Sequence, residues 1–236
     1  MWSGPRNLST ALMRSFENRA DCNVSDEPFY ATYLAQTGLD HPMRDEVLAS
    51  QPTNWREVAA ALTGPAPGDA PLWYQKHMTH HMLPQFGHEW LAECRNAFLI
   101  RDPARVLASY VRSRETVTLA DIGVVQQSEL FDRVADRLGH APPVIDAADV
   151  LANPARTLGA LCAALQIAFD PAMLSWPPGK RASDGVWAPA WYASVEASTG
   201  FSPPDGKYAV PELPTHLAVI ADAARAHYAR LAEFRL

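Results

Sequence analysis

The sequence predicts a three-layer α/β fold, in which helices flank a central parallel β-sheet. Short apolar segments typical of buried strands alternate with segments whose apolar residues recur at helical spacing. Such alternation is typical of parallel strands joined by crossover helices. The hydrophobic fraction of 48% and the charged fraction of 19% are those of an ordinary globular protein. Because 236 residues are enough for one sizeable core, we expect a single domain over residues 1–236.

The chain opens with strand and helix signals. Residues 1–3 are predicted to end a buried strand, and the apolar spacing that follows predicts a helix from about Ser9 to Arg19. A second strand is expected at Cys22–Ser25, with a helix from Pro28, a favourable first helical residue. Residues 39–69 are mixed in character and contain several prolines. We interpret them as a possible lid or insertion.

Strands and helices alternate over the rest of the chain. Ala97–Ile100 is the clearest buried strand, because all of its residues are apolar. The helix after it starts at Pro103. The other expected elements are strands at Leu72–Gln75 and Pro143–Asp146, and helices over Val125–Leu138, from Asn153 and over Glu212–Phe234.

The turn before the first helix, Gly4-Pro5-Arg6-Asn7-Leu8-Ser9-Thr10, is a candidate anion site. The first amides of a helix lack intrahelical partners and the helix dipole is positive at this end, so phosphate or sulfate can bind there. Arg6 adds a full charge and a forked set of donors. The second glycine and the lysine of a P-loop are missing from this turn. The alternative is that Pro5 and Ser9 simply begin an ordinary helix.

A second basic element follows the strand that ends at Ile100. Arg101 comes directly after this strand, and Arg105, Ser109 and Arg112 share one face of the next helix. An arginine at a strand end with a serine beyond it suits a second phosphate. For Arg105 we prefer the alternative, a solvated helix face. The net charge of −6 disfavours nucleic acids and membranes as partners, since their binders rely on a positive field.

Candidate acid–base groups follow the second and third strands. Glu27 stands at the carboxyl end of a strand, where ligands gather in open parallel sheets. Lys76 and His77 directly follow the third strand segment. His77 and His81 are four residues apart, a spacing that metal ligands use, but no nearby carboxylate or cysteine completes a set. We therefore expect no metal.

The cysteines and the lengths of the apolar runs indicate the cellular compartment in which the protein is expected. The three cysteines, Cys22, Cys94 and Cys162, form no C-x-x-C pair. We expect them to be reduced, which favours the cytoplasm. No apolar run approaches the length of a membrane span, and no signal peptide is expected.

Several segments, in order along the chain, resemble the sulfotransferases that use 3′-phosphoadenosine 5′-phosphosulfate (PAPS), and bacterial members in particular. Residues 5–10 are similar to the Pro-Lys-Ser-Gly-Thr-Thr loop of that family, with Arg6 in place of its lysine and Leu8 in place of its glycine. Residues 71–84 resemble the segment that carries Lys-Thr-His-Leu-Pro, and Lys76 matches its lysine. Residues 145–174 resemble an acidic strand end and the helices after it.

The arginine and serine that hold the 3′-phosphate in that family are matched by Arg101 and Ser109, which are eight residues apart. The loop that closes over this phosphate is similar to the segment at Lys180 and Arg181, with Gly185 and Trp187 following.

The resemblance implies a P-loop NTPase-like sulfotransferase fold, PAPS as co-substrate and its product PAP. It implies transfer of the sulfuryl group to a hydroxyl or amine of a small-molecule acceptor. Arg6 and Lys76 would neutralise the leaving phosphate, and Glu27, His77 or His80 would be the base. The implied binding residues for PAPS are Arg6, Asn7, Leu8, Ser9, Thr10, Arg101, Ser109, Lys180 and Arg181.

Two other functions are compatible with the same segments. In a P-loop kinase or nucleotide hydrolase, Ser9 or Thr10 would hold magnesium together with Asp102. A ligand-binding relative would keep the anion-binding turn without the chemistry. The sequence does not predict the oligomeric state.

Overall fold

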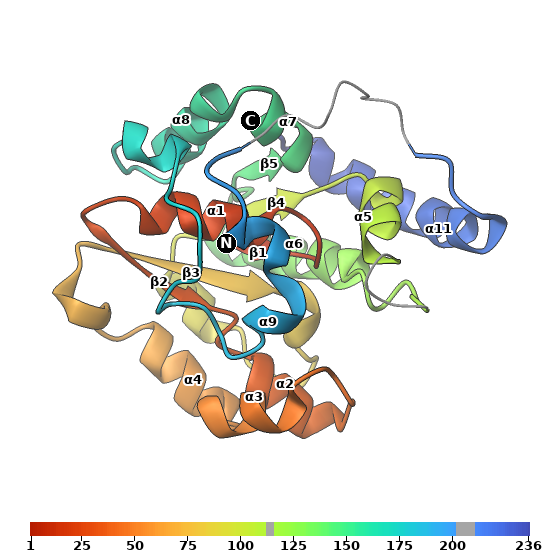
Figure 1. Cartoon of the computed structure of the whole chain (residues 1–236), viewed down its shortest axis with the longest axis horizontal. Helices are drawn as coiled ribbons and strands as arrows, with labels where there is room; N and C mark the ends of the chain where they lie inside the picture. The colour runs from red at the N-terminus through yellow and green to blue at the C-terminus, as the bar shows by residue number, and fades with distance from the viewer. Residues whose placement is uncertain (112–115, 202–210) are drawn as a thin grey trace.

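A computed structural model of the chain describes residues 1–111, 116–201 and 211–236, so Arg112 lies outside the described residues. A five-stranded sheet runs through the molecule in the order β2-β3-β1-β4-β5, and all of its neighbouring strands are parallel. Figure 1 shows the sheet at the centre with helices around it. The strands are β1 (Trp2–Ser3), β2 (Cys22–Asp26), β3 (Leu72–Met78), β4 (Phe98–Ile100) and β5 (Val144–Asp146).

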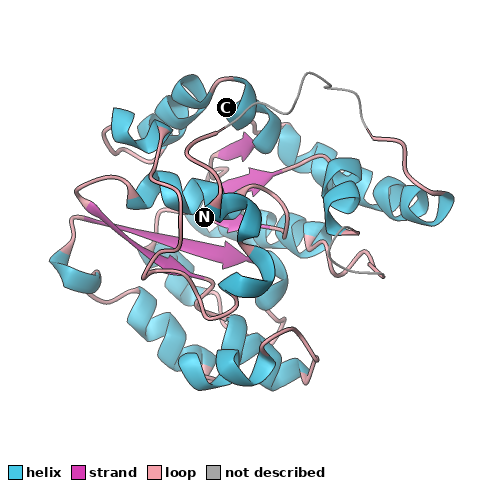
Figure 2. Cartoon of the chain, in the orientation of Figure 1, coloured by secondary structure: helices cyan, strands magenta, loops and turns pink. Residues whose placement is uncertain are grey.

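Helices cover both faces of the sheet, as Figure 2 shows in cyan. Within the described residues, the α-helices are α1 (Ser9–Glu17), α2 (Tyr30–Thr37), α3 (Arg44–Ser50), α4 (Trp55–Leu62), α5 (Pro103–Tyr110), α6 (Val124–Leu138), α7 (Ala147–Ala152), α8 (Pro154–Ala164), α9 (Ala188–Trp191), α10 (Ala193–Glu196) and α11 (Thr215–Ala232). Short 3₁₀ turns are η1 (Pro67–Asp69), η2 (Thr79–His81), η3 (Glu89–Glu93) and η4 (Pro171–Leu174).

The core packed against the sheet lies in two parts, one on each face. Leu99 of β4 packs with residues of α1, α7 and α8, whereas its neighbours Phe98 and Ile100 pack with residues of α4, α6 and α11. This division follows from the strand itself, because successive side chains point to opposite faces. The predicted three-layer α/β fold is thereby confirmed.

Strand register brings the ends of the strands to one edge. Asp26, the last residue of β2, is opposite Lys76 in β3, and Ser3 of β1 is opposite both Met78 and Leu99. Residues that follow β1, β2 and β4 therefore lie along the carboxyl edge of the sheet. This edge is where ligands bind in open parallel sheets.

One strand end differs from the sequence-based prediction. The sequence predicts a third strand that ends near Gln75, but the strand continues through Met78, so His77 lies inside it. Residues 39–69, which the sequence suggests as a possible lid or insertion, contain α3 and α4, and α4 packs Val58 and Leu62 into the sheet core. Figure 1 shows α2, α3 and α4 grouped beside β2. Among the described residues, no helix combines the length and apolar character needed to cross a bilayer.

Candidate functional site

A cavity of about 440 Å³ opens at the carboxyl edge of the sheet. Its wall is built by the turn after β1, by the ends of β2, β3 and β4, and by the segment that carries α9 and α10. The sequence-predicted residues that line it are Arg6, Leu8, Ser9, Thr10, Glu27, Lys76, His80, Arg101 and Ser109. Asn7, His77, Lys180 and Arg181 do not line it.

The turn after β1 uses an unusual backbone. Arg6 and Leu8 have φ angles of 63° and 73°, in the left-handed region. Glycine enters this region without strain, and other residues do so rarely. The backbone at Leu8 therefore keeps the conformation that glycine would favour. Leu8 is also the residue before α1, and its side chain makes no capping hydrogen bond to the first amides of the helix.

Arg101 and Ser109, which follow β4, contact this turn directly. Arg101 Nη1 donates a hydrogen bond to the backbone oxygen of Arg6 at 2.6 Å, and Arg6 Nε donates to Ser109 Oγ at 3.0 Å. Burial, together with the neighbouring cations Arg105 and Arg6, lowers the pKa of Arg101. No carboxylate is within ion-pair distance of Arg101 among the residues that the structure describes. This concentration of positive charge suits an anionic ligand.

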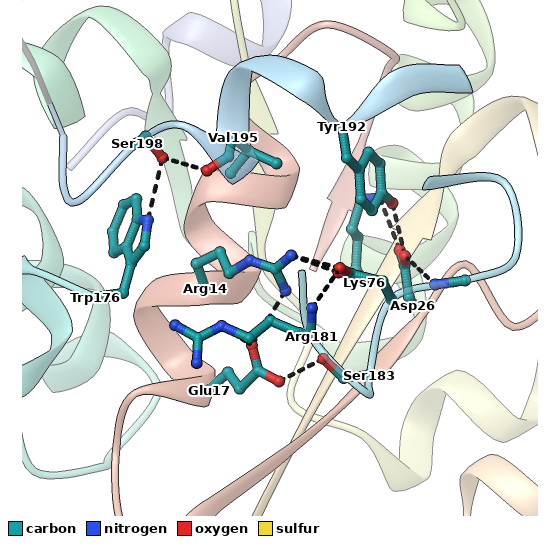
Figure 3. A network of polar contacts seen from close by, with 12 residues as sticks. Arg14, Glu17, Asp26, Lys76, Trp176, Arg181, Ser183, Tyr192, Val195 and Ser198 are labelled. Carbon is teal, nitrogen blue, oxygen red and sulfur yellow. Dashed lines mark hydrogen bonds and ion pairs between the residues drawn. The ribbon is translucent and has the colours of Figure 1, made fainter. Parts of the chain in front are cut away.

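A buried ionic network forms the other side of the cavity. The ammonium of Lys76 contacts Asp26 Oδ1 at 2.8 Å, Glu27 Oε1 at 2.7 Å and the Tyr192 hydroxyl at 2.6 Å. An ammonium has three donors, so each of them is used. The Tyr192 hydroxyl donates to Asp26 Oδ2 at 2.6 Å, and it accepts from Trp187 Nε1 at 3.1 Å. Figure 3 shows Asp26, Lys76 and Tyr192 converging.

Burial and neighbouring charges have opposing effects on the pKa values of Lys76 and Glu27. Burial alone would lower the pKa of Lys76, but Asp26 and Glu27 raise it well above its ordinary value. Burial and the charge of Asp26 raise the pKa of Glu27 despite the opposing effect of Lys76. The second oxygen of Glu27, Oε2, makes no hydrogen bond in the described parts of the chain. Glu27 thus offers a basic oxygen at the wall of the cavity.

The structure separates His77 from the cavity. Its ring stacks on Trp2 with centroids 4.2 Å apart, and its Nε2 is 3.2 Å from Gln75 Oε1. Burial lowers the pKa of His77 well below its ordinary value. The cause is strand alternation: Lys76 and Met78 face the cavity, so His77 between them faces the core. Of Glu27 and His77, only Glu27 is in a position to meet a ligand.

The loop at Lys180 and Arg181 is also turned away from the cavity. Lys180 is exposed. The backbone amide of Arg181 donates to Asp184 at 2.8 Å, and its Nε is 3.9 Å from Glu17 at the end of α1. Arg14 of α1 is bound to the same two acids, so the loop is held against this helix, as Figure 3 shows. In this arrangement neither cation lines the cavity.

The sequence interpretation missed a group of rings at the cavity, of which Tyr30, His41 and His81 line its wall. His81 stacks on Tyr30 at 4.6 Å and on Tyr33 at 4.8 Å, and the Tyr30 hydroxyl is 2.9 Å from His41 Nδ1. Burial, followed by the neighbouring His80, lowers the pKa of His81 well below its ordinary value. The available signal was the spacing of Tyr30 and Tyr33, which places both on one face of the helix after Glu27.

The model of the family described as "Sulfotransferase domain" matches residues 1–229 of the chain. Branched-chain-amino-acid aminotransferase-like protein 1 of Arabidopsis thaliana is 39% identical over 203 residues, which is 86% of this chain and 36% of that protein. The chain thus spans about a third of the length of this curated relative.

Two solved structures share the fold. The sulfotransferase domain from the Synechococcus PCC 7002 olefin synthase has a TM-score of 0.57 at 16% identity, with 94% of this chain and 92% of that chain covered. The sulfotransferase domain from the curacin biosynthetic pathway has a TM-score of 0.52 at 16% identity, with 95% of each chain covered. The family model matches nearly the whole chain, from residue 1 to residue 229 in α11. This protein therefore belongs to the sulfotransferase domain family, a family of transferases.

Proposed function

We propose that the protein transfers the sulfuryl group of PAPS to a hydroxyl or amine of a small-molecule acceptor. The observation that carries this proposal is the junction of Arg6, Arg101 and Ser109 inside the cavity. Two cations from distant parts of the chain meet there, and no carboxylate of the described residues is within ion-pair distance of Arg101. A nucleotide with phosphate groups at both its 3′ and 5′ positions supplies the missing negative charge at two points.

The two ends of such a nucleotide fit two parts of this junction. The turn after β1, with Arg6 and the hydroxyls of Ser9 and Thr10, suits the 5′-phosphosulfate at the start of α1. Arg101 and Ser109 suit the 3′-phosphate. Parallel pairing of β1 with β4 fixes these two sites relative to each other.

The reaction needs positioning, charge stabilisation and removal of one proton. By analogy with phosphoryl transfer, the sulfuryl group moves in line from the leaving phosphate to the acceptor, and charge builds up on that phosphate. Arg6 and the first amides of α1 neutralise this charge. Glu27 accepts the proton of the acceptor hydroxyl or amine on its open oxygen, Oε2, because a raised pKa makes a carboxylate a better base.

Lys76 takes a different role from the one first expected. Its three donors are already used by Asp26, Glu27 and Tyr192, so it has no proton to give to a leaving phosphate while these contacts hold. We assign to Lys76 the task of holding Glu27 in place. Arg6 is then the cation that serves the leaving group.

The acceptor is expected to carry an apolar or aromatic part. Tyr30, His41, His81 and Trp191 line the cavity beyond Glu27, and their rings offer flat surfaces for such a group. The rival reading, a magnesium-dependent kinase, is less well supported. Asp102, its expected metal ligand, accepts a hydrogen bond from the Arg105 amide at 3.2 Å at the start of α5, and it does not line the cavity.

The test compares nucleotides in the absence and presence of magnesium. PAP is expected to raise the melting temperature without magnesium, since a ligand that binds only the folded state stabilises it. The protein incubated with [³⁵S]PAPS and a panel of phenols, alcohols and amines is expected to label at least one acceptor. Stabilisation by ATP that requires magnesium, with no effect of PAP, would replace the proposal with the kinase reading.

A further inference from the structure

One hydroxyl in the cavity wall belongs neither to the nucleotide site nor to the base. Tyr192 lies between α9 and α10 and is 4% exposed. Its oxygen accepts from Lys76 Nζ at 2.6 Å and from Trp187 Nε1 at 3.1 Å, and it donates to Asp26 Oδ2 at 2.6 Å. Because these three hydrogen bonds are buried, the hydroxyl holds Lys76, Trp187 and Asp26 in place.

The contacts of Lys76 show what Tyr192 fixes. Of its three ammonium hydrogens, one goes to Asp26, one to Glu27 and the last to Tyr192. Asp26 also receives hydrogen bonds from the Tyr192 hydroxyl and from the Gly185 amide at 3.1 Å. Both oxygens of Asp26 are thus occupied, whereas only one oxygen of Glu27, a residue that lines the cavity, has a hydrogen bond from the described residues.

We propose that Tyr192 is a positioning residue of the transfer reaction, which holds the ammonium of Lys76 between Asp26 and Glu27 and so leaves one oxygen of Glu27 available to the acceptor. Tyr192 acts through these neighbours and need not touch the reacting atoms. The inference rests on the proposed role of Glu27 as the base. It also ties the cavity wall formed by α9 and α10 to the chemistry, because Tyr192 belongs to that wall.

Removing the Tyr192 hydroxyl should change the position of the Lys76 ammonium. In Tyr192→Phe, Asp26 loses one of its donors, so Lys76 is drawn toward Asp26 and away from Glu27. The protonated form of Glu27 then becomes more favourable, and its pKa rises further.

The charged groups that face Glu27 are few. Asp26 comes from β2, Lys76 from β3 and Tyr192 from the segment of α9 and α10. The histidines in the same cavity wall are His41, His80 and His81. Burial lowers the pKa of His81 well below its ordinary value, whereas burial and the charge of Asp26 raise the pKa of Glu27.

The experiment measures the titration of Glu27 directly, by carbon NMR of protein labelled at the glutamate side-chain carboxyls, with Glu27→Gln to assign the signal. Tyr192→Phe is expected to raise the titration midpoint by roughly half to one pH unit, which corresponds to loss of one hydrogen bond. Trp187→Phe removes the donor to the Tyr192 oxygen together with part of a buried ring, and it leaves the Tyr192 hydroxyl in place. It is expected to shift the midpoint less in the same direction, and it provides a second test should Tyr192→Phe fold poorly.

The matched control is Tyr74→Phe. Tyr74 is a buried tyrosine of β3 whose hydroxyl has no hydrogen-bond partner in the described parts of the chain. This control is expected to leave the midpoint unchanged. An unchanged midpoint in Tyr192→Phe and Trp187→Phe, or an equal shift in Tyr74→Phe, would overturn the inference.

Calorimetry with PAP on the same proteins separates this inference from the proposed function. Wild-type protein that does not bind PAP contradicts the proposed function, while the NMR midpoint still decides the role of Tyr192. If Tyr192 positions Lys76 and Glu27 only, Tyr192→Phe is expected to bind PAP as the wild type does.

Discussion

Arg101 donates a hydrogen bond from Nη1 to the backbone oxygen of Arg6 at 2.6 Å, so the strand end at β4 and the turn after β1 form one unit. The pairing of β1 with β4 holds the two segments side by side, with Ser3 opposite Leu99. Residues that are 95 positions apart in the chain therefore meet in one cavity.

The first prediction concerns nucleotide binding. Arg6→Ala and Arg101→Ala are each expected to weaken PAP binding about 10- to 100-fold, because each removes a charged hydrogen-bond donor from a bound phosphate. Isothermal titration calorimetry measures the change. Arg105→Ala is the matched control, since Arg105 comes from the same basic region but does not line the cavity. Equal, small losses in all three variants would contradict the assignment.

The second prediction concerns Glu27. Glu27→Gln is expected to lower kcat roughly 100- to 10,000-fold, the range typical of a general base, while PAP binding stays near that of the wild type. The wild-type pH profile should show an acid limb above the ordinary carboxyl value of 4.5, because burial raises the pKa of Glu27 and only its deprotonated form accepts a proton. Glutamine has no such titration, so the acid limb should disappear from the residual activity. A Glu27→Gln variant with wild-type kcat would remove Glu27 from the mechanism.

The third prediction concerns the buried lysine. Lys76→Met is expected to destabilise the fold by roughly 3–5 kcal/mol at pH 7, because Asp26 and Glu27 would be left buried without their cation. The loss should shrink at lower pH, where the carboxyls can take up protons. Urea unfolding at pH 7 and pH 5 measures both effects. Arg44→Met, which breaks the exposed pair with Asp45, is the control and should change stability by less than about 1 kcal/mol.

The meeting of Arg6 and Arg101 in one cavity could be predicted because the order of strands and turns is visible in the sequence. Arg6 and Arg101 each follow an apolar strand segment, and a parallel sheet brings such residues to one edge. The wall formed by Glu27 and Lys76 was harder to predict. Nothing local marks Met78 as the end of β3, and that end decides that Lys76 faces the cavity while His77 faces the core.

Long-range pairing explains the other differences. The position of Arg181 depends on Glu17 and Asp184, acids that no motif associates with its loop. Burial of Lys76 depends on Asp26 across the strand register and on Tyr192, which is 116 residues further along the chain. Sequence patterns report spacing within an element, whereas these contacts are set by packing between elements.

The last prediction concerns the buried histidines and the effect of acid on stability. Burial lowers the pKa of both His77 and His81 well below 6.5, so the folded protein resists protons that the unfolded chain accepts. Their contribution to stability is therefore fully present above pH 6.5 and is lost as the pH falls toward their folded values, by at most about 1.4 kcal/mol per pH unit for each histidine.

Urea unfolding at pH 7.5, 6.5 and 5.5 measures this loss. His77→Asn removes a group that takes up a proton when the chain unfolds. The unfolding free energy should therefore depend less steeply on pH, even if the variant is less stable at every pH. The control is His140→Asn, because His140 is exposed and should leave the slope unchanged. If His77→Asn kept the full wild-type slope, proton uptake by a buried His77 would not be a source of acid sensitivity.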